Sequence, residues 1–275
     1  MNSKNNNDDI MRQAWDAVAN SYQDRYDLKT KRIHYGPLCP SEDKLQLLGD
    51  LKDKILLELG SGAGQNAIVV AKSGAKVTAI DISAEQIRYG RKLAKSSNVE
   101  VNYKVGSFLD YCDMGYEDEF DIVLSVYALQ YCYDVAEMEK VFKYIFKSLK
   151  SGGRFVFSLD HPIRAHGYWI NINDVFAIDN YFDRDQKEWI YKFPETKTST
   201  KMSGSFKTLG DYFTSLVKAG FEVKQLIEPE PILHDDNSNF GIKSSYGTDS
   251  PDDPFSFDHL SRIPGTIVFQ AFKSR

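Results

Sequence analysis

The sequence predicts an α/β fold: a doubly wound, mostly parallel sheet of seven strands with helices on both faces. Three observations support this prediction. Short apolar strands alternate with amphipathic helices from residue 55 onward. A glycine-rich turn follows the first of these strands. Two long segments, residues 161–206 and 229–264, interrupt the alternation, and segments of this length often have a function of their own.

The first half of the chain begins with a polar stretch, residues 1–9, which we expect to be frayed. A helix is predicted next, because apolar side chains recur at helical spacing at Met11, Ala14, Trp15, Val18 and Tyr22. A strand, a turn, a helix, a strand and a helix then follow over residues 55–59, 60–64, 65–73, 76–80 and 83–97. Gly74 ends the first of these two helices, and Ser83 with Gln86 forms a capping box for the second.

The second half continues the same alternation. Five further strands are predicted, over residues 99–105, 120–126, 154–159, 221–227 and 266–272. Asp134 caps a helix that Gly152 and Gly153 end. Thr208 caps the last helix, which Gly220 ends.

The chain is predicted to divide into four parts. They are an N-terminal helical lid (1–40), a cofactor-binding core (41–160), a cap insertion (161–206) and the remainder of the core sheet (207–275). The last part includes the loop 229–264, which has seven acidic and two basic residues. This loop therefore accounts for the net charge of −5 of the whole chain.

The composition restricts the classes of function. The 275 residues are 42% hydrophobic and 27% charged, which is typical of a globular protein and excludes disorder for most of the chain. With no basic surplus, we expect no nucleic-acid partner. No apolar run is long enough to span a membrane and the first residues lack a secretory signal, so a cytoplasmic protein is expected. Its three cysteines, outside any metal-ligand spacing, are expected to be buried free thiols, with no metal bound.

The glycine-rich turn is the motif that points to chemistry. It reads Glu58-Leu59-Gly60-Ser61-Gly62-Ala63-Gly64 and lies between a strand and a helix. Glycines allow a ligand to approach the backbone, and the helix N-terminus offers free N–H groups. Asp81 ends the next strand, 21 residues after Gly60, the spacing of an acid that binds ribose hydroxyls. Together these features predict a nucleotide-type cofactor.

The residues around the turn favour one cofactor over others. An NAD site would place its third glycine at position 65, where this chain has Gln65, and no Walker sequence is present. Glu58 places a carboxylate in the strand, which suits a ligand that carries positive charge. S-adenosylmethionine has an ammonium and a sulfonium group and therefore fits better than a pyrophosphate.

These motifs resemble those of the class I S-adenosylmethionine-dependent methyltransferases, and most closely the small-molecule branch of ubiquinone and menaquinone biosynthesis. The resemblance extends over roughly residues 15–272, and its specific parts are LLELGSGAGQN, AIDIS, FDIVLSVYALQY and LKSGGRFVF. It implies a Rossmann-like methyltransferase fold with an antiparallel last strand. It also implies S-adenosylmethionine as cofactor and methyl transfer to an O, N or C atom of a small, partly apolar molecule.

The resemblance also implies which residues bind the cofactor. The turn would lie along the methionine part, Asp81 would bind the ribose, and Ile82 would flank the adenine. Many family members have an aspartate after the glycine of the third strand, where this chain has Ser107. The full set of candidates is Tyr22, Tyr35, Glu58, Gly60, Ser61, Gly62, Gln65, Asn66, Asp81, Ile82, Gln86, Gly106, Ser107, Phe108 and Ser125. For Gln65 and Asn66 a place on the helix surface is the alternative, and for Tyr22 it is core packing.

Two features of the segment 161–206 bear on the acceptor. His161 follows the fifth strand and is the candidate general base, with an ordinary loop histidine as the alternative. The other histidines, including His34, are weaker candidates. The segment contains nine aromatic residues, which either line an acceptor pocket or hold the cap together: Tyr168, Trp169, Phe176, Tyr181, Phe182, Trp189, Tyr191, Phe193 and Phe206.

The sequence also bears on functions other than methyl transfer to a small molecule. The Asn/Asp-Pro-Pro-Tyr motif of DNA amino methyltransferases is missing, because the corresponding residues are Ser125-Val126-Tyr127-Ala128. An NAD-linked oxidoreductase and a cofactor-binding sensor without turnover remain as alternatives. We expect a monomer or a homodimer.

Overall fold

The computed structural model describes residues 3–170, 175–232, 257 and 261–274, with side chains from residue 7 onward except that of Trp169. Its main sheet has the strand order β10-β11-β5-β4-β1-β2-β3. The strands are β1 (Ile55–Leu59), β2 (Lys76–Asp81), β3 (Asn102–Val105), β4 (Phe120–Val126), β5 (Leu149–Asp160), β10 (Phe221–Ile227) and β11 (Thr266–Lys273). Because β11 runs antiparallel to both neighbours and the remaining pairs are parallel, the predicted fold class is confirmed.

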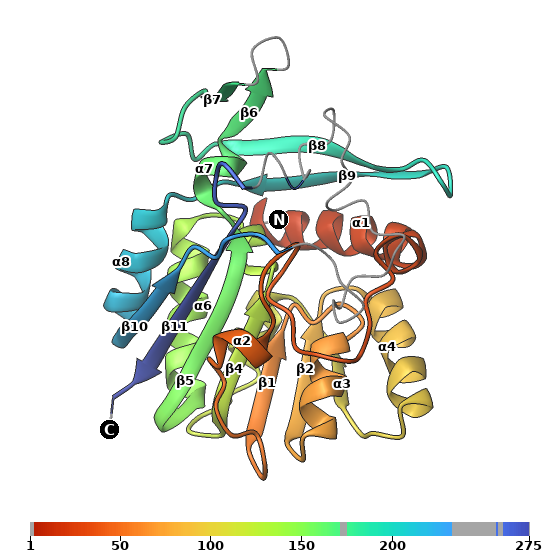
Figure 1. Ribbon diagram of the computed structural model, residues 1–275, viewed down its shortest axis with the longest axis vertical. Coiled ribbons are helices and arrows are strands. Elements are labelled where there is room, and N and C mark those ends of the chain that lie inside the picture. The colour runs from red at the N-terminus through yellow and green to blue at the C-terminus, as the bar shows by residue number, and fades with distance from the viewer. Residues whose placement is uncertain (1–2, 171–174, 233–256, 258–260, 275) are drawn as a thin grey trace.

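Helices cover both faces of this sheet (Figure 1). They are α2 (Glu42–Leu45), α3 (Gln65–Lys72), α4 (Ala84–Ser96), α5 (Phe108–Asp113), α6 (Val135–Ser148) and α8 (Leu209–Ala219). Successive strand residues point to opposite faces. Leu57 therefore packs into a core with side chains of α5, α6 and α8, and Leu56 packs into a second core with those of α3 and α4. All residues of β1 after Ile55 are buried, as expected for a central parallel strand.

The long N-terminal helix α1 (Ser3–Tyr26) lies across the carboxyl ends of the strands, where Figure 1 shows it between the sheet and the cap. The cap consists of α7 (Pro162–Ala165), a hairpin of β6 (Gly167–Ile170) and β7 (Val175–Ile178), and a hairpin of β8 (Gln186–Phe193) and β9 (Thr198–Ser205). A third apolar core joins α1 to the second hairpin through Met11, Val18, Tyr26, Phe193 and Met202. This packing fixes α1 over the edge of the sheet where ligands bind in such folds.

Several sequence predictions need correction. The first helix begins at Ser3, so residues 3–9 are helical and not frayed. The glycines Gly152 and Gly153 do not end a helix but lie inside β5, because α6 ends at Ser148 and the chain turns directly into the strand. Helix α5 was not predicted, although Ser107 and Asp110 form a capping box at its start. Most of the acidic loop 229–264 lies outside the described residues.

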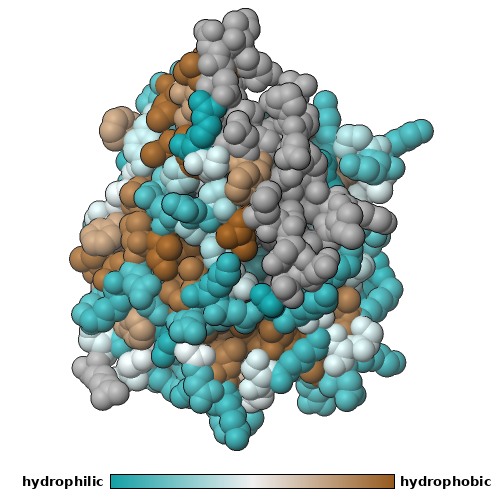
Figure 2. Space-filling view, in the orientation of Figure 1, coloured by the Kyte–Doolittle hydropathy of each residue, from teal (hydrophilic) through white to brown (hydrophobic). Residues whose placement is uncertain are grey.

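The described part of the chain contains no helix that is long and apolar enough to cross a membrane. Its three cysteines are buried free thiols. The hairpin of β6 and β7 has apolar side chains on its surface (Figure 2), at Tyr168, Ile170, Val175 and Ile178.

Candidate functional site

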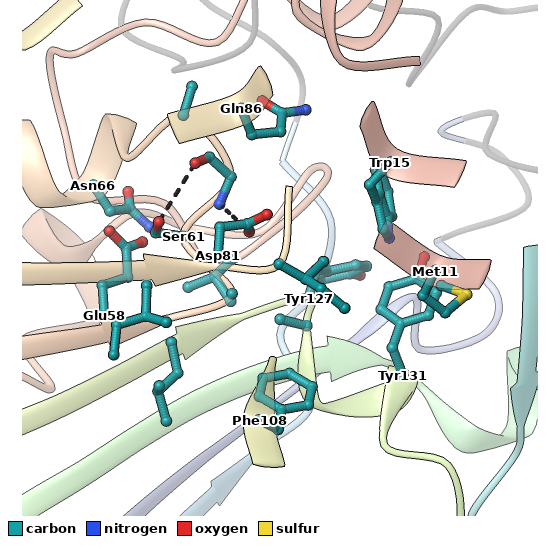
Figure 3. Close-up of a pocket in the computed structure, with 18 of the residues that line it drawn as sticks. Met11, Trp15, Glu58, Ser61, Asn66, Asp81, Gln86, Phe108, Tyr127 and Tyr131 are labelled. Carbon is teal, nitrogen blue, oxygen red and sulfur yellow. Dashed lines mark hydrogen bonds between the residues drawn. The ribbon is translucent and has the colours of Figure 1, made fainter. Parts of the chain in front are cut away.

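A deep pocket opens between α1 and the carboxyl ends of β1, β2, β3 and β4 (Figure 3). Its walls combine the glycine-rich turn, the residues that follow β2, β3 and β4, and side chains of α1. In Figure 3, Glu58 and Asn66 lie on one side, Asp81 at the centre, and Trp15 and Tyr131 on the opposite side. The pocket therefore brings the predicted cofactor motifs into one space.

The turn after β1 lines the pocket and is held against β2. The N–H groups of Gly60 and Ser61 donate to the Ile80 carbonyl at 2.8 and 3.0 Å, which fixes the turn against β2. Gly62 has φ +56°, and a Cβ at this position would meet no atom within 4 Å. Because Gly62 lines the pocket, this open space is space for a ligand.

Asp81 is held by two backbone donors at the centre of the pocket. Gly62 N–H donates to Oδ2 at 2.7 Å, and Ser83 N–H donates to Oδ1 at 2.9 Å. Burial raises the pKa of this carboxyl to about 6, and the two hydrogen bonds limit the rise. Each oxygen keeps a second lone pair, so Asp81 is able to accept hydrogen bonds from two adjacent hydroxyls.

Glu58 is the second carboxyl of the pocket and is only 3% exposed. Its Oε2 accepts from Ala67 N–H, at the start of α3, at 2.9 Å. Burial raises the pKa of Glu58 to about 8, so the carboxyl is mostly protonated at neutral pH when no cation is nearby. A positively charged ligand would stabilise its ionised form.

Proton release should therefore accompany binding of a cationic ligand at pH 7. A carboxyl with a pKa of about 8 is roughly 90% protonated at that pH, and a bound cation lowers the pKa. Calorimetric titrations of S-adenosylmethionine in phosphate and in Tris measure the protons released, because the two buffers differ in ionisation enthalpy. We expect release of close to one proton in the native protein and little in Glu58→Gln, and equal heats in both buffers for the native protein would contradict this reading.

Helix α1 is joined to the pocket by a chain of buried amides. Gln65 Nε2 donates to Gln23 Oε1 at 2.6 Å, and Gln23 Nε2 donates to Gln86 Oε1 at 2.8 Å. All three line the pocket, so Gln65 and Gln86 lie where predicted but are already bonded to α1. The sequence patterns did not indicate Gln23 as a pocket residue, although it directly follows the candidate Tyr22. Its partners come from residues more than 40 positions away, which no local pattern reveals.

The other predicted residues of the pocket come from four segments. Ile82 follows β2, and Gly106, Ser107 and Phe108 follow β3. Tyr22 lines the pocket from α1, and its ring also packs edge-on to Trp15 at a centroid distance of 5.7 Å. Asn66 also lines the pocket, where its amide Oδ1 accepts from the backbone N–H of His34 at 2.9 Å.

Two candidate residues are not in the pocket wall. Tyr35 is fully buried in the core, where its hydroxyl donates to the Glu42 carboxylate. Ser125 is also fully buried, and its hydroxyl donates to the Leu59 carbonyl at 2.8 Å, which joins β4 to β1. Both side chains are therefore structural in this fold, and the prediction that they contact the cofactor is corrected.

His161 does not occupy the position of a general base either. Its side chain is 1% exposed, lies outside the pocket wall and caps α7, because Nδ1 accepts from Ile163 N–H at 3.1 Å. That bond leaves the proton on Nε2, which donates to Glu228 Oε1 at 2.8 Å. Burial lowers its pKa although Glu228 opposes this effect. The alternative of an ordinary structural histidine describes His161 better.

The imidazole that does line the pocket is that of His34, which the sequence ranked lower. Burial lowers its pKa to about 4, so it is neutral at physiological pH. Sequence reasoning also missed Trp15, Tyr127 and Tyr131 as pocket residues. A signal was present for Trp15, because it shares one helical stripe with Met11 and Tyr22. The chain directly after β4 supplies the other two, and such strand ends are where sites form.

The aromatic residues of the cap hold the cap together. Of the eight whose side chains are described, none belongs to the pocket wall. Tyr191 packs edge-on against Trp15 at 6.3 Å and shares a hydrogen bond with Tyr26, and Trp189 stacks on Phe206. The expectation that several of these rings line the acceptor pocket is therefore corrected, and the pocket takes its rings from α1 and from the segments after β3 and β4. The described residues contain no group of three or more potential ligands placed to hold a metal ion.

Comparison with known proteins bears directly on this site. Residues 57–157 match the family model described as a methyltransferase domain, and this range contains the turn, Asp81, Ser107 and the end of β4. Residues 57–157 are therefore a methyltransferase domain. S-adenosylmethionine is accordingly its cofactor.

Individual relatives of the protein are distant in sequence. It is 26% identical over 151 residues to the sterol 4-C-methyltransferase strm-1 of Caenorhabditis elegans, covering 54% of this chain and 38% of that protein. It is 30% identical over 114 residues to a ubiquinone biosynthesis O-methyltransferase of Serratia proteamaculans, covering 42% of this chain and 46% of that one. The chain thus spans less than half the length of these two curated relatives.

Solved structures share the fold over most of the chain. A Listeria monocytogenes protein described as an S-adenosylmethionine-dependent methyltransferase has a TM-score of 0.64 at 24% identity, covering 85% of this chain and 97% of that one. The cyclase SpnF has a TM-score of 0.58 at 15% identity, covering 96% of this chain and 95% of that one. At such identities the likeness concerns the fold, and the chemistry has to be argued from the site.

The residues present fit S-adenosylmethionine. Gly62 leaves open space beside the turn, and Asp81 presents two oriented oxygens that suit ribose hydroxyls. The buried carboxyl of Glu58, which also lines the pocket, suits the positively charged groups of this cofactor. A pyrophosphate would instead bring no positive charge to stabilise the ionised form of Glu58.

Proposed function

We propose that the protein transfers a methyl group from S-adenosylmethionine to an O, N or C atom of a small, partly apolar molecule. One observation carries the proposal: the pocket that contains Asp81 and the glycine-rich turn continues to a wall formed by Trp15, Tyr22 and Tyr131. Rings with a few polar groups suit a small acceptor with apolar surface. The names of two relatives, a sterol methyltransferase and a ubiquinone biosynthesis methyltransferase, support the same class.

The chain's own contribution would be to bind, to align and to exclude water. When bound, S-adenosylmethionine supplies an activated methyl group with a good leaving group. Asp81 and Glu58 would fix the orientation of the cofactor, and α1 covers the pocket on the side of the cap. Alignment and exclusion of water supply most of the rate enhancement that such a displacement needs. A base is required only for an acceptor that keeps its proton, and His34 is then better placed than His161.

A methyl-uptake assay tests the proposal and its alternatives. The purified protein is incubated with methyl-labelled S-adenosylmethionine and a fractionated metabolite extract, and in parallel with DNA, RNA and total protein. We expect label in a small, organic-extractable fraction, and no transfer by Gly62→Val. Label in a macromolecule would refute the proposed acceptor class, and cofactor binding without transfer to any fraction would favour the sensor.

We further propose the arrangement and setting of the molecule. Residues 1–40 would act as a lid over the core at 41–160, residues 161–206 would form the cap, and residues 207–275 would complete the sheet. A cytoplasmic monomer or homodimer without a nucleic-acid partner fits the absence of a basic surplus, the net charge being −5. Light scattering of the purified protein distinguishes these two assemblies from larger ones.

A further inference from the structure

Helix α1 contacts in turn the three loops that carry the cofactor motifs. Asp8 interacts with Ser107 after β3, Asp16 accepts from the Ser83 hydroxyl after β2 at 2.6 Å, and Gln23 bonds to Gln65 after β1. Positions separated by eight and seven residues share one side of a helix. One side of α1 therefore runs along the whole cofactor site, and its first turns lie at the end formed by Ser107.

Asp8 is the acidic residue of α1 that belongs to the pocket wall. It lines the pocket together with Asn7, Gly106, Ser107 and Phe108. Its carboxyl is partly buried, in contrast to the exposed carboxyl of Asp9 beside it. Burial raises the pKa of Asp8, and its hydrogen bond with the Ser107 side chain opposes the rise.

The loop after β3 contributes the Ser107 side chain to the pocket wall. Its hydroxyl caps α5 by accepting from Asp110 N–H at 3.1 Å, and the Asp110 carboxylate accepts in return from the Ser107 N–H at 2.8 Å. The Asp110 carboxylate is thus engaged in the capping box of α5. The core loop itself therefore offers the pocket a hydroxyl, and the carboxylate beside that hydroxyl comes from α1.

We propose that Asp8 recognises the adenine base of the cofactor by accepting a hydrogen bond from its exocyclic amino group. This inference rests on the proposed function, because it assumes an adenosyl cofactor in this pocket. Adenine presents an amino donor at the position where hypoxanthine presents a carbonyl acceptor. A carboxylate accepts a hydrogen bond from the amino group of adenine and repels the carbonyl group of hypoxanthine. Asp8, on the lid helix α1, would therefore set the base specificity of the pocket.

A simpler role for Asp8 would be to anchor α1 to Ser107. The two roles differ in their effect on the preference of the pocket for adenosyl over inosyl ligands. An anchor affects every ligand of the pocket equally. A residue that recognises the base affects the affinities of adenosyl and inosyl ligands differently, because removal of a hydrogen-bond partner weakens only the ligand that bonds to it.

The test is a calorimetric comparison of S-adenosylhomocysteine with S-inosylhomocysteine on three forms of the full chain. These are the native protein, Asp8→Asn and the matched control Asp9→Asn, whose carboxylate is 65% exposed and pairs with Arg12. The native protein and the control should prefer the adenosyl ligand by about tenfold or more. In Asp8→Asn the preference should fall to within about threefold, since an amide is able to face either base as donor or acceptor.

The possible results of these titrations distinguish the inference from its alternatives. Weakening of both ligands by the same factor in Asp8→Asn would overturn the inference and leave Asp8 as an anchor. Failure of the native protein to bind either ligand would overturn the proposed function, and with it this inference. Denaturant unfolding of the three forms shows whether the substitution changes stability, and a preference retained by a fully folded Asp8→Asn would contradict the inference.

Discussion

Replacement of Asp81 with alanine should weaken S-adenosylmethionine binding by about 100-fold or more. The carboxylate would accept two hydrogen bonds from ribose hydroxyls, and a bond to a charged group contributes about 1.5–3 kcal/mol. Loss of both therefore removes about 3 kcal/mol at least, which corresponds to roughly two powers of ten in the dissociation constant. Isothermal titration calorimetry measures this directly.

The control must separate binding from folding, because Asp81 also accepts from Gly62 and Ser83. Asp81→Asn keeps one carbonyl acceptor for these backbone donors while it removes the charge. Asp53→Asn is the matched surface control, since Asp53 is an exposed loop residue whose backbone, at φ +59°, suits asparagine. Unchanged affinity in a folded Asp81→Asn or Asp81→Ala protein would exclude Asp81 as the ribose ligand.

Gly62→Val should abolish detectable cofactor binding. The open space at the Cβ position of Gly62 belongs to the pocket, so a branched side chain would occupy the path of the ligand. The residue is also in the left-handed region at φ +56°, which is unfavourable for a side chain by about 1–2 kcal/mol. We therefore expect a modest loss of stability in thermal unfolding and a complete loss of binding in calorimetry.

Gly60→Ala provides the contrast. A Cβ at Gly60 would lie 2.1 Å from the Cβ of Ala128, so this substitution disturbs the packing between the turn and the segment after β4. It should lower the melting temperature more than Gly62→Ala does, because the Cβ of Gly62 meets nothing. The account of the turn would be wrong if the two alanine variants had the same stability and both bound the cofactor normally.

The sheet and the cofactor motifs were predictable because they are local patterns. Strand β1, the turn and α3 follow one another directly, and Asp81 ends the next strand, so spacing along the chain fixes their positions. The cap of α4 was equally local, since the Ser83 hydroxyl accepts from Gln86 N–H at 3.1 Å. The predicted capping box is incomplete, however, because the Ser83 N–H donates to Asp81 and the Gln86 amide oxygen accepts from Gln23.

What the sequence did not reveal depends on contacts between distant segments. His161 ends a strand at the expected edge, but its hydrogen bond to Glu228 turns it into a structural residue. Tyr35 is directed into the core by Glu42 and not toward the pocket. The roles of Asp8 and Gln23 follow from how α1 lies on the sheet, and the amphipathic pattern of the helix indicates a buried face but not its neighbours.

The same limit applies to the cap. The partners of its strands are fixed by hairpin register, such as Trp189 opposite Met202, which the sequence does not specify. The cap is rich in aromatic residues, as the sequence shows. Its rings pack on one another, and amino-acid composition does not distinguish such rings from rings that line a pocket.

The most direct test of the central claim, that the pocket between α1 and the turn binds S-adenosylmethionine, is one set of calorimetric titrations of the purified protein. S-adenosylhomocysteine, the demethylated form of the cofactor, is titrated first, and NAD is titrated under the same conditions. The account predicts one saturable site per chain for S-adenosylhomocysteine and no heat of binding for NAD, because Gln65 stands where an NAD site has its third glycine and its side chain is bonded to α1. Saturable binding of NAD, or no binding of S-adenosylhomocysteine by the folded protein, would contradict it.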